Sequence, residues 1–476
     1  MSGYEPTIGL EIHAQLRTVT KLFCNSKNDP DETRPNVNVC PICMGHPGTL
    51  PTLNREAVKH VLKVGVALGG SIADFTEWDR KSYFYPDIPK GYQISQYQHP
   101  LVTGGSLKGV AITRIHLEED TARSQHTPTE LSAGKGGYSL IDFNRAGVPL
   151  MELVTEPVIH SAKEAGDFAR ELQLLLRYLD VSDADMEKGH LRVEVNISVN
   201  KQQTTNNQQL GTKTEVKNIN SFRAAEKAIE YETRRQIAAL EAGEEIVQET
   251  RGWDDAKGET YSQRAKEFSH DYRYFPEPDL PKLKLSEIPE FSEEILRKEL
   301  PELPWERRER YLALGLKQED ADMFVANITL GDFFDDVSKH TREVKLAANY
   351  IASDLASLLT EPFDISKGSV SFARLMDMVA GGEVSSRGAK DILRVLIERG
   401  GSPREVAERE GLLQQSDEGA LLKIVEQVIK GNPEVVMQYK GGKKESLQFL
   451  IGQAMKLSKG AGNPKVLGEL LEQRLA

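Results

Sequence analysis

The spacing of apolar residues changes near Pro289, and this change limits the folds that the chain can adopt. Before Pro289, apolar and polar residues alternate in short runs, as in half-buried strands. Helical spacing interrupts the strands after Ser161, where Glu164 completes a capping box, and again over about residues 222–240. After Pro289 the spacing is helical, with frequent Gly and Pro breaks. The sequence therefore predicts an α+β fold, with a largely antiparallel sheet followed by helices.

Chain length divides this fold further. A domain usually holds roughly 100–200 residues, so 476 residues suggest two or three domains. The proline-rich stretch 276–291 is typical of extended chain or a linker, and the pattern breaks again around residues 400–403. We therefore expect a sheet domain over residues 1–290, an all-α domain over 291–410 and a small α-helical tail domain over 411–476.

Charge is distributed unevenly along the chain. The net charge of -12 argues against a general nucleic-acid binder. Residues 421–476, however, hold nine Lys or Arg and five Asp or Glu, a local charge of +4 that leaves -16 elsewhere. This basic tail either holds RNA phosphates or is a solvated helical face. The candidate RNA contacts are Lys440, Lys443, Lys444, Lys456 and Lys459.

The composition indicates a globular protein, with 39% apolar and 28% charged residues. No apolar run approaches the ~20 residues of a membrane helix, so no membrane association is expected. The first residues lack a basic segment followed by an apolar one, so no signal peptide is expected. Three cysteines cannot form a disulfide framework, which favours a reducing compartment, the cytoplasm.

Several expected strands carry functional side chains on one face, because residues two apart in a strand point the same way. These sets are Glu11 and His13; His116, Glu118 and Asp120; Glu194 and Asn196; and Glu215 and Lys217. Carboxylates with an occasional imidazole bind hard cations, and crowded acids repel unless a cation lies among them. Two interpretations stay open: a metal site for phosphoryl transfer, or the solvated face of an antiparallel sheet.

The stretch 79–97 combines rings, cations and amides, and its prolines and glycine prevent a regular helix. Its candidate residues are Arg80, Lys81, Tyr83, Tyr85, Lys90, Tyr92, Gln93 and Gln96. The stretch suits an anionic or nucleotide ligand, and equally an ordinary loop with aromatic anchors. Neither a GxxxxGK[ST] loop nor a GxGxxG turn after a strand occurs, so an ATP site would be of an uncommon type.

The three cysteines have the spacing of a metal site. Cys40 and Cys43 form a C-P-I-C knuckle, and Cys24 precedes it. A structural zinc ion normally has four ligands, but Ser26 stands where a cysteine would complete a C-x-C pair, and His46 is a candidate substitute. The alternative is a set of three buried, inert thiols.

Nine segments, read in order, resemble the successive signatures of one family. They are GLEIHAQL, CPICMGHPGTLP, DRKSYFYPDIPKGYQISQY, RIHLEED, DFNRAGVPLMELVTEP, LRVEVNISV, TEVKNINSF, QETRGWDDAKGET and HDYRYFPEPDLP. The last part, GNPEVVMQYKGGKKESLQFLIGQAMKLSKGAGNPKV, resembles the tRNA-binding tail shared with YqeY-type proteins. The motifs are long, collinear and span essentially the whole chain. By this resemblance the chain is identified as a member of the GatB/GatE family, on the GatB side, because it is too short for the domain inserted in GatE.

The resemblance implies a cradle domain that uses ATP and Mg²⁺ to phosphorylate the side-chain carboxylate of Glu or Asp misattached to tRNA(Gln) or tRNA(Asn). Ammonia, released from glutamine in an amidase partner, would travel through a channel and displace the phosphate, while a third, small partner clasps the other two into a heterotrimer. Such a protein is a carbon–nitrogen ligase that works within a complex. The competing hypothesis is a non-catalytic tRNA-binding scaffold. A self-sufficient metallohydrolase would need a compact ligand set such as H-E-x-x-H, which is absent.

The resemblance also assigns residues to roles. The metal-binding positions match Glu11, His13, Glu118 and Glu119, without deciding between the last two. Lys81 is expected to neutralise phosphate or carboxylate, and the pocket is expected to be shaped by Arg80, Tyr83, Tyr85 and Gln93. The polar cradle residues, with catalytic, channel or supporting roles, are Glu152, Glu194 and Lys217. Two departures are Ser26 in place of a cysteine and Glu194 in place of an aspartate, a side chain one methylene longer.

Overall fold

The computed structural model describes residues 3–126, 138–201, 210–265, 272–359, 368–414, 418–458 and 462–475. The chain divides into two compact units, Met1–Pro304 and Trp305–Ala476. The first contains the sheets and the second is helical, which confirms the predicted α+β class. The further division of the helical part near residue 410 stays a prediction.

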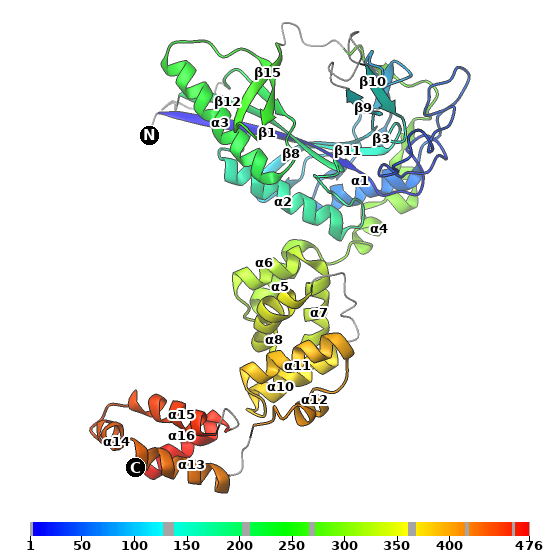
Figure 1. Cartoon of the computed structure of the whole chain (residues 1–476). Helices are drawn as coiled ribbons and strands as arrows, with labels where there is room; N and C mark the ends of the chain where they lie inside the picture. Colours follow the sequence, from blue (N-terminus) through cyan, green and yellow to red (C-terminus); the bar gives the residue numbers. More distant parts are fainter. Residues whose placement is uncertain are drawn as a thin grey trace. The chain divides into compact units, whose positions relative to one another are not determined.

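One mixed sheet dominates the first unit (Figure 1). Among the described residues its strands follow the order β15-β14-β13-β12-β1-β11-β8-β6-β2, with β7 paired to β8. Only the β13–β14 pairing is parallel, so the sheet is largely antiparallel, as predicted. The bounds are β1 Tyr4–Gln15, β2 Ser71–Ile72, β6 Val102–Thr103, β7 Ser106–Leu107, β8 Val110–Glu119, β11 Pro149–Thr155, β12 Leu191–Lys201, β13 Thr214–Lys217, β14 Glu249–Asp254 and β15 Glu259–Ala265.

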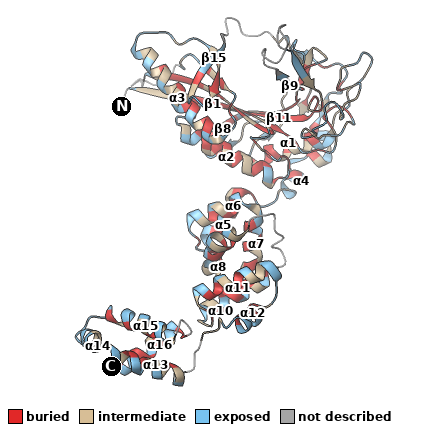
Figure 2. Cartoon of the chain, viewed as in Figure 1, coloured by how far each residue is buried: buried red, intermediate tan, exposed pale blue. Residues whose placement is uncertain are grey.

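The two faces of this sheet differ in character. In β1, Ile8, Leu10 and Ile12 are buried, while the alternate residues Glu11 and His13 face the other way. Helix α1 (Arg55–Ala67) packs against β8, and α3 (Phe222–Glu241) packs against β12 and α2 (Ala162–Tyr178). Figure 1 shows these helices along the sheet, and Figure 2 shows that each has buried residues. These helices cover the apolar face of the strands, and the candidate site lies on the opposite, polar face.

The start of α2 follows the N-cap predicted at Ser161. Ser161 accepts a hydrogen bond from the backbone N–H of Glu164 at 3.2 Å, which fixes the first turn of α2. The Glu164 carboxylate accepts from the N–H of His160 at 2.9 Å, one residue earlier than in a capping box. Ser221 caps α3 in the same way, by accepting from the N–H of Ala224.

A small three-stranded sheet lies at the end of β8. It pairs β4 (Asp79–Ser82) with β5 (Tyr92–Ser95) and with β16 (Phe275–Pro276). Two further pairings join β3 (Phe75–Thr76) to β17 (Leu283–Lys284), and β9 (Arg123–His126) to β10 (Ser139–Asp142). The stretch 276–291 was predicted as extended chain or a linker, but it is extended only in part, because Leu285–Glu287 and Pro289–Phe291 form 3-10 helices, and it is not a free linker. Its residues Leu280, Leu285 and Phe291 are buried in the first unit.

The second unit consists of helices after the short α4 (Glu293–Lys298), which belongs to the first unit. The bounds are α5 Pro304–Ala313, α6 Gln318–Ala326, α7 Ile328–Ser338, α8 Val344–Tyr350, α9 Ala356–Leu358, α10 Ser369–Ala380, α11 Ser386–Arg399, α12 Pro403–Arg409, α13 Glu418–Gly431, α14 Pro433–Lys440, α15 Ser446–Leu457 and α16 Pro464–Leu475. Helices α13, α15 and α16 share an apolar core that includes Leu421, Val425, Leu450 and Leu471. Within the described part of the chain, every helix is too short or too polar to cross a membrane.

Candidate active site

The register of four neighbouring strands brings polar side chains into one row. His13 on β1 lies opposite Glu152 on β11 and opposite Arg192 on β12. Glu152 in turn lies opposite His116 on β8. Residues that are directly opposite in an antiparallel pair share a face and come within contact distance. The row Arg192–His13–Glu152–His116 therefore crosses the polar face of the sheet.

Glu152 is the centre of this row. His13 Nε2 lies 3.2 Å from Glu152 Oε2, and His116 Nε2 lies 3.4 Å from the same oxygen. Glu118 joins from β8, with an oxygen 3.8 Å from His13 Nε2, and accepts a hydrogen bond from the Ser95 hydroxyl at 2.8 Å. Glu11 lies 3.7 Å from His13. We call Glu11, His13, His116, Glu118 and Glu152 the charged cluster.

Burial and mutual charge interactions shift the pKa values of several side chains in the cluster. Burial, together with the charges of Glu152 and Glu194, raises the pKa of Glu11 to about 7. Burial lowers the pKa of His13, but its hydrogen bond to Glu152 and the surrounding carboxylates outweigh this and raise it to about 9. Burial opposes ionisation of Glu152 as well, yet the two imidazoles hold its pKa below the usual range. Perturbed groups gathered at one place are typical of functional sites.

The donor set of the cluster fits a hard cation. Within and beside the cluster, three groups of carboxylate and imidazole side chains have ligand atoms within 4.8 Å of one another. They are Glu11, His13 and Glu152; His116, Glu118 and Glu152; and Glu11, Glu194 and Glu215. Carboxylate oxygens with one or two imidazoles are ligands for Mg²⁺ or Mn²⁺, and a cation would relieve the repulsion that raises the pKa of Glu11.

The structure separates Glu118 from Glu119. Adjacent residues of a strand point to opposite faces, so only one of the two can join the cluster. Glu118 does so, whereas Glu119 contacts Lys90 Nζ at 2.5 Å and accepts from the N–H of Ile94 at 2.9 Å. The sequence left open whether Glu118 or Glu119 lies beside Glu11 and His13. The structure places Glu118 there and Glu119 on the other side of the strand.

Lys81 is the cation that faces the cluster from the small sheet. Burial lowers its pKa, but the charges of Glu118 and Glu152 and the nearby Tyr274 hydroxyl more than offset this, so the net direction is upward. Its ammonium lies 5.0 Å from the centre of the Tyr272 ring. Lys81 therefore stays charged. Among the residues that the structure describes, its ammonium forms no salt bridge and contacts the Tyr272 ring. Such a cation is available to an anionic ligand.

The other cationic candidate of this sheet is already paired. The Arg80 guanidinium makes two hydrogen bonds to the Glu277 carboxylate, at 2.7 and 2.8 Å, and a third to Asp279 at 3.2 Å. Its side chain also lies over the Tyr92 ring. These contacts tie β4 to the chain after β16, so Arg80 holds the small sheet in place.

The remaining predicted residues surround the cluster. Lys217 Nζ lies 2.7 Å from Glu194 and 3.6 Å from Glu215, at the β12–β13 side. The Gln93 amide donates to the backbone carbonyl of Glu119 at 2.7 Å, a supporting contact. The rings of Tyr83 and Tyr85 stack on each other, 5.8 Å apart, and both are exposed.

The structure gives three residues at the site a position or role that the sequence did not assign to them individually. His116 and Asp120 were recognised only as part of a polar strand face, and Arg192 was not singled out. Asp120 accepts hydrogen bonds from Arg192 and from Gln15, each at 2.9 Å, and so joins β8 to β12 and β1. Glu152, which the resemblance had already named, is also marked by its surroundings, because it is the single charged residue of the strand PLMELVT.

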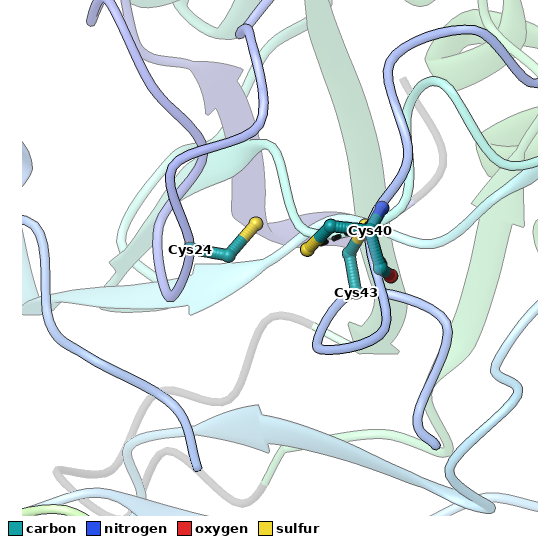
Figure 3. Close-up of side chains that lie close together, drawn as sticks. All are labelled: Cys24, Cys40 and Cys43. Atoms are coloured by element: carbon teal, nitrogen blue, oxygen red, sulfur yellow. Dashed lines mark hydrogen bonds between the residues drawn. The ribbon is translucent and has the colours of Figure 1, made fainter. Parts of the chain in front are cut away.

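The three cysteines meet in one place, as their spacing predicted (Figure 3). The sulfurs of Cys40 and Cys43 lie 3.8 Å apart, and all three lie within 4.8 Å of one another. A hydrogen bond from Cys24 lowers the pKa of Cys43 to about 4, and the same bond, with burial, raises the pKa of Cys24. The fully buried Lys21 ammonium lies 3.8 Å from Cys43 Sγ.

The tail lysines lie on the surface of the last helices. Lys440 ends α14, Lys443 and Lys444 follow it, and Lys456 lies in α15; all four are exposed. Lys459 lies outside the described residues.

Comparison with known proteins decides the family. Residues 6–289 match the model of the GatB/GatE catalytic domain, and residues 332–475 match that of the GatB domain. The chain belongs to the GatB/GatE family. Similar curated proteins are named as the B subunit of aspartyl/glutamyl-tRNA(Asn/Gln) amidotransferase. The one from Crocosphaera subtropica is 44% identical, over 99% of this chain and 98% of its own length. The one from Moorella thermoacetica is also 44% identical, over 99% and 100%.

Proposed function

We propose that the chain is the GatB component of a tRNA-dependent amidotransferase and carries the site that activates the substrate carboxylate. The observation that carries the proposal is the charged cluster, which lies inside the region that matches the family's catalytic domain. The substrates are Glu-tRNA(Gln), Asp-tRNA(Asn) or both. The partners are a glutamine-hydrolysing amidase and a small clasping protein, and the compartment is the cytoplasm, where these tRNAs are used.

The proposed reaction has two steps, phosphorylation of the carboxylate and amidation of the acyl phosphate. The substrate carboxylate attacks the γ-phosphorus of ATP, which forms an acyl phosphate and releases ADP. Ammonia then attacks the acyl carbon, and inorganic phosphate leaves as the amide forms. The first step is needed because a free carboxylate would have to expel oxide, a very poor leaving group. Because an acyl phosphate hydrolyses in water, the two steps must share one enclosed site.

The cluster residues supply the electrostatics of the first step. A Mg²⁺ ion held by Glu11, His13, Glu118 and Glu152 would offset the charge of the transferred phosphoryl group. Lys81 faces the same space from the small sheet and would orient either the substrate carboxylate or the phosphate. The ion pair of Lys217 with Glu194 would border the site at the β12 side.

Reconstitution tests this function. The full chain, assembled with its two partners, should convert a misacylated tRNA into the amidated form when ATP, Mg²⁺ and glutamine are present. The chain alone, given ATP and glutamine, should form little product because it has no ammonia source of its own. A correctly assembled complex that forms neither Gln-tRNA nor Asn-tRNA would refute the proposal.

We also propose a structural zinc ion at the three cysteines. The sulfur set fits zinc, and a zinc ion with three thiolates would give the buried Lys21 ammonium, whose pKa burial lowers, a counter-charge. The fourth position has no cysteine, and the Ser26 hydroxyl lies 3.9 Å from Cys43 Sγ. Three sulfurs hold zinc less tightly than four, so this ion should exchange more easily than in a four-cysteine site.

Replacing Ser26 by Cys should strengthen zinc binding, because it adds a fourth sulfur ligand next to Cys43. We expect Ser26→Cys to keep about one zinc per chain in a chelator dialysis that strips the parent protein. Metal content per chain is the measurement. Ser71→Cys adds an exposed thiol elsewhere and serves as the control. Equal zinc retention by the parent and by Ser26→Cys would contradict the three-sulfur site.

The exposed tail lysines are proposed to hold tRNA phosphates. Replacing Lys443 and Lys444 together by Glu should weaken tRNA binding, and should reduce the slope of log affinity against log salt by about 1–2. Lys298→Glu, an equally exposed change in α4, should leave both quantities unchanged. Nitrocellulose filter binding at several salt concentrations measures both. An unaltered salt slope in the double variant would place the phosphate contacts elsewhere.

A further inference from the structure

A row of tyrosines borders the charged cluster on the side of the small sheet. Tyr97 and Tyr274 stack with ring centres 4.5 Å apart and planes 9° apart. Tyr272 meets Tyr274 edge to face at 6.0 Å, and Tyr83 stacks on Tyr85. We call these five residues the tyrosine row. The chain contributes them from three separate places, after β4, after β5 and before β16.

The row is continuous with the proposed active site. Lys81 lies over the Tyr272 ring, and the Tyr274 hydroxyl is close enough to Glu118 and Glu152 that their charges help burial to raise its pKa to about 12. At the other end, the backbone N–H of Ser82, the residue before Tyr83, donates a hydrogen bond to the backbone carbonyl of Tyr272 at 2.9 Å. A molecule that presents a carboxylate to the cluster and continues outward on this side would therefore contact these rings.

The backbone holds the row in an uncommon conformation. Arg273, between Tyr272 and Tyr274, has a positive φ of 47°, which is rare for a residue with a long side chain and costs about 1 kcal/mol or more. The loop with Tyr83 and Tyr85 is fixed by backbone hydrogen bonds from Tyr83 to Gly91 and from Ile88 to Tyr85. The rings are therefore positioned before any ligand arrives. Tyr97 is nevertheless 54% exposed and Tyr85 52% exposed.

We infer that the tyrosine row takes the unpaired 3′ end of the RNA substrate by stacking its last bases. This rests on the proposed function, because the amino acid to be activated is attached to the terminal ribose. Aromatic rings in series bind successive bases of a single strand with little regard to their identity. An ATP molecule offers a single base, whereas two exposed stacks at opposite ends of a row fit several bases in succession.

Binding measurements on the assembled complex test the inference without any chemistry. Removing the last three nucleotides of the tRNA should weaken its affinity for the parent complex by about tenfold, which corresponds to the loss of one or more stacked bases. In a complex with Tyr97→Leu the same truncation should cost about threefold or less. Tyr97→Phe keeps the ring and should behave like the parent. Tyr261→Ala removes an exposed ring on β15 and is the matched control.

A second measurement uses only the parent complex, so it does not depend on whether a variant folds. A tRNA with 2-aminopurine as its last base should lose most of its fluorescence on binding the parent complex, because stacking quenches it. Three results would overturn the inference. The first is that truncation leaves the affinity of the parent complex for tRNA unchanged, and the second is that Tyr97→Leu raises the KM for ATP while its tRNA affinity stays constant. The third is that the Tyr97→Leu chain no longer assembles with its two partners. Failure of the proposed function would show separately, as absent amidation.

Discussion

Replacing Glu152 by Gln is expected to lower amide formation by the assembled complex about 10³-fold while the chain still folds. Glu152 contacts both imidazoles and belongs to two of the three candidate cation groups. The amide keeps the shape of the side chain but carries no charge. It therefore cannot neutralise His13 and cannot offer a carboxylate to a cation. The initial rate should be measured at saturating ATP with ammonia in place of glutamine, so that ammonia supply does not limit it.

Glu156→Gln is the matched control, because Glu156 directly follows the same strand and its carboxylate accepts from the Thr113 hydroxyl at the surface. This variant should keep the parent rate within about twofold. If the chain were a scaffold without catalytic function, the two variants would form amide at the same rate. If the Glu152→Gln complex forms amide at the parent rate, the charged cluster does not take part in the reaction.

Local spacing was sufficient to place four of the five residues of the charged cluster on strand faces. Glu11 with His13, and His116 with Glu118, lie two residues apart in alternating segments, so each pair could be assigned to one strand face. The capping residue Ser161 likewise marked the start of α2. These signals are local, because they depend on backbone period and on hydrogen bonds within one turn.

The pairing of strands was not predictable in the same way. β1 pairs with β11 and β12, which are more than a hundred residues distant, and only this register puts Glu152 opposite His13. The choice between Glu118 and Glu119 also depends on the register, since either residue could face the cluster in a slipped strand. The role of Arg80 was hidden for a similar reason, because its partner Glu277 lies on a distant segment.

Replacing Asp120 by Asn is expected to lower the free energy of unfolding of the first unit by about 3–5 kcal/mol at pH 7. Asp120 is buried beside two guanidinium groups, and Arg192 donates to it at 2.9 Å while Arg145 Nε lies 3.7 Å away. The amide leaves both cations without their counter-charge in a region of low dielectric. Thermal unfolding and hydrogen exchange of β8 and β12 in the full chain would measure the loss. Asp183→Asn, which removes a surface partner of Arg17, should cost less than about 1 kcal/mol.

The effect of Asp120→Asn should shrink in acid. Burial opposes ionisation of Asp120, but the charges of Arg192 and Arg145 outweigh it and lower the pKa to about 2, below the roughly 3.9 of an unfolded chain. A lowered pKa contributes stability above the unfolded value and loses it as the pH falls toward the folded value. The difference between parent and variant should therefore be constant from pH 7 to about pH 5 and should narrow between pH 4 and pH 2. A difference that stays constant down to pH 2.5 would mean that Asp120 stabilises the strands by shape and hydrogen bonding and not by its charge.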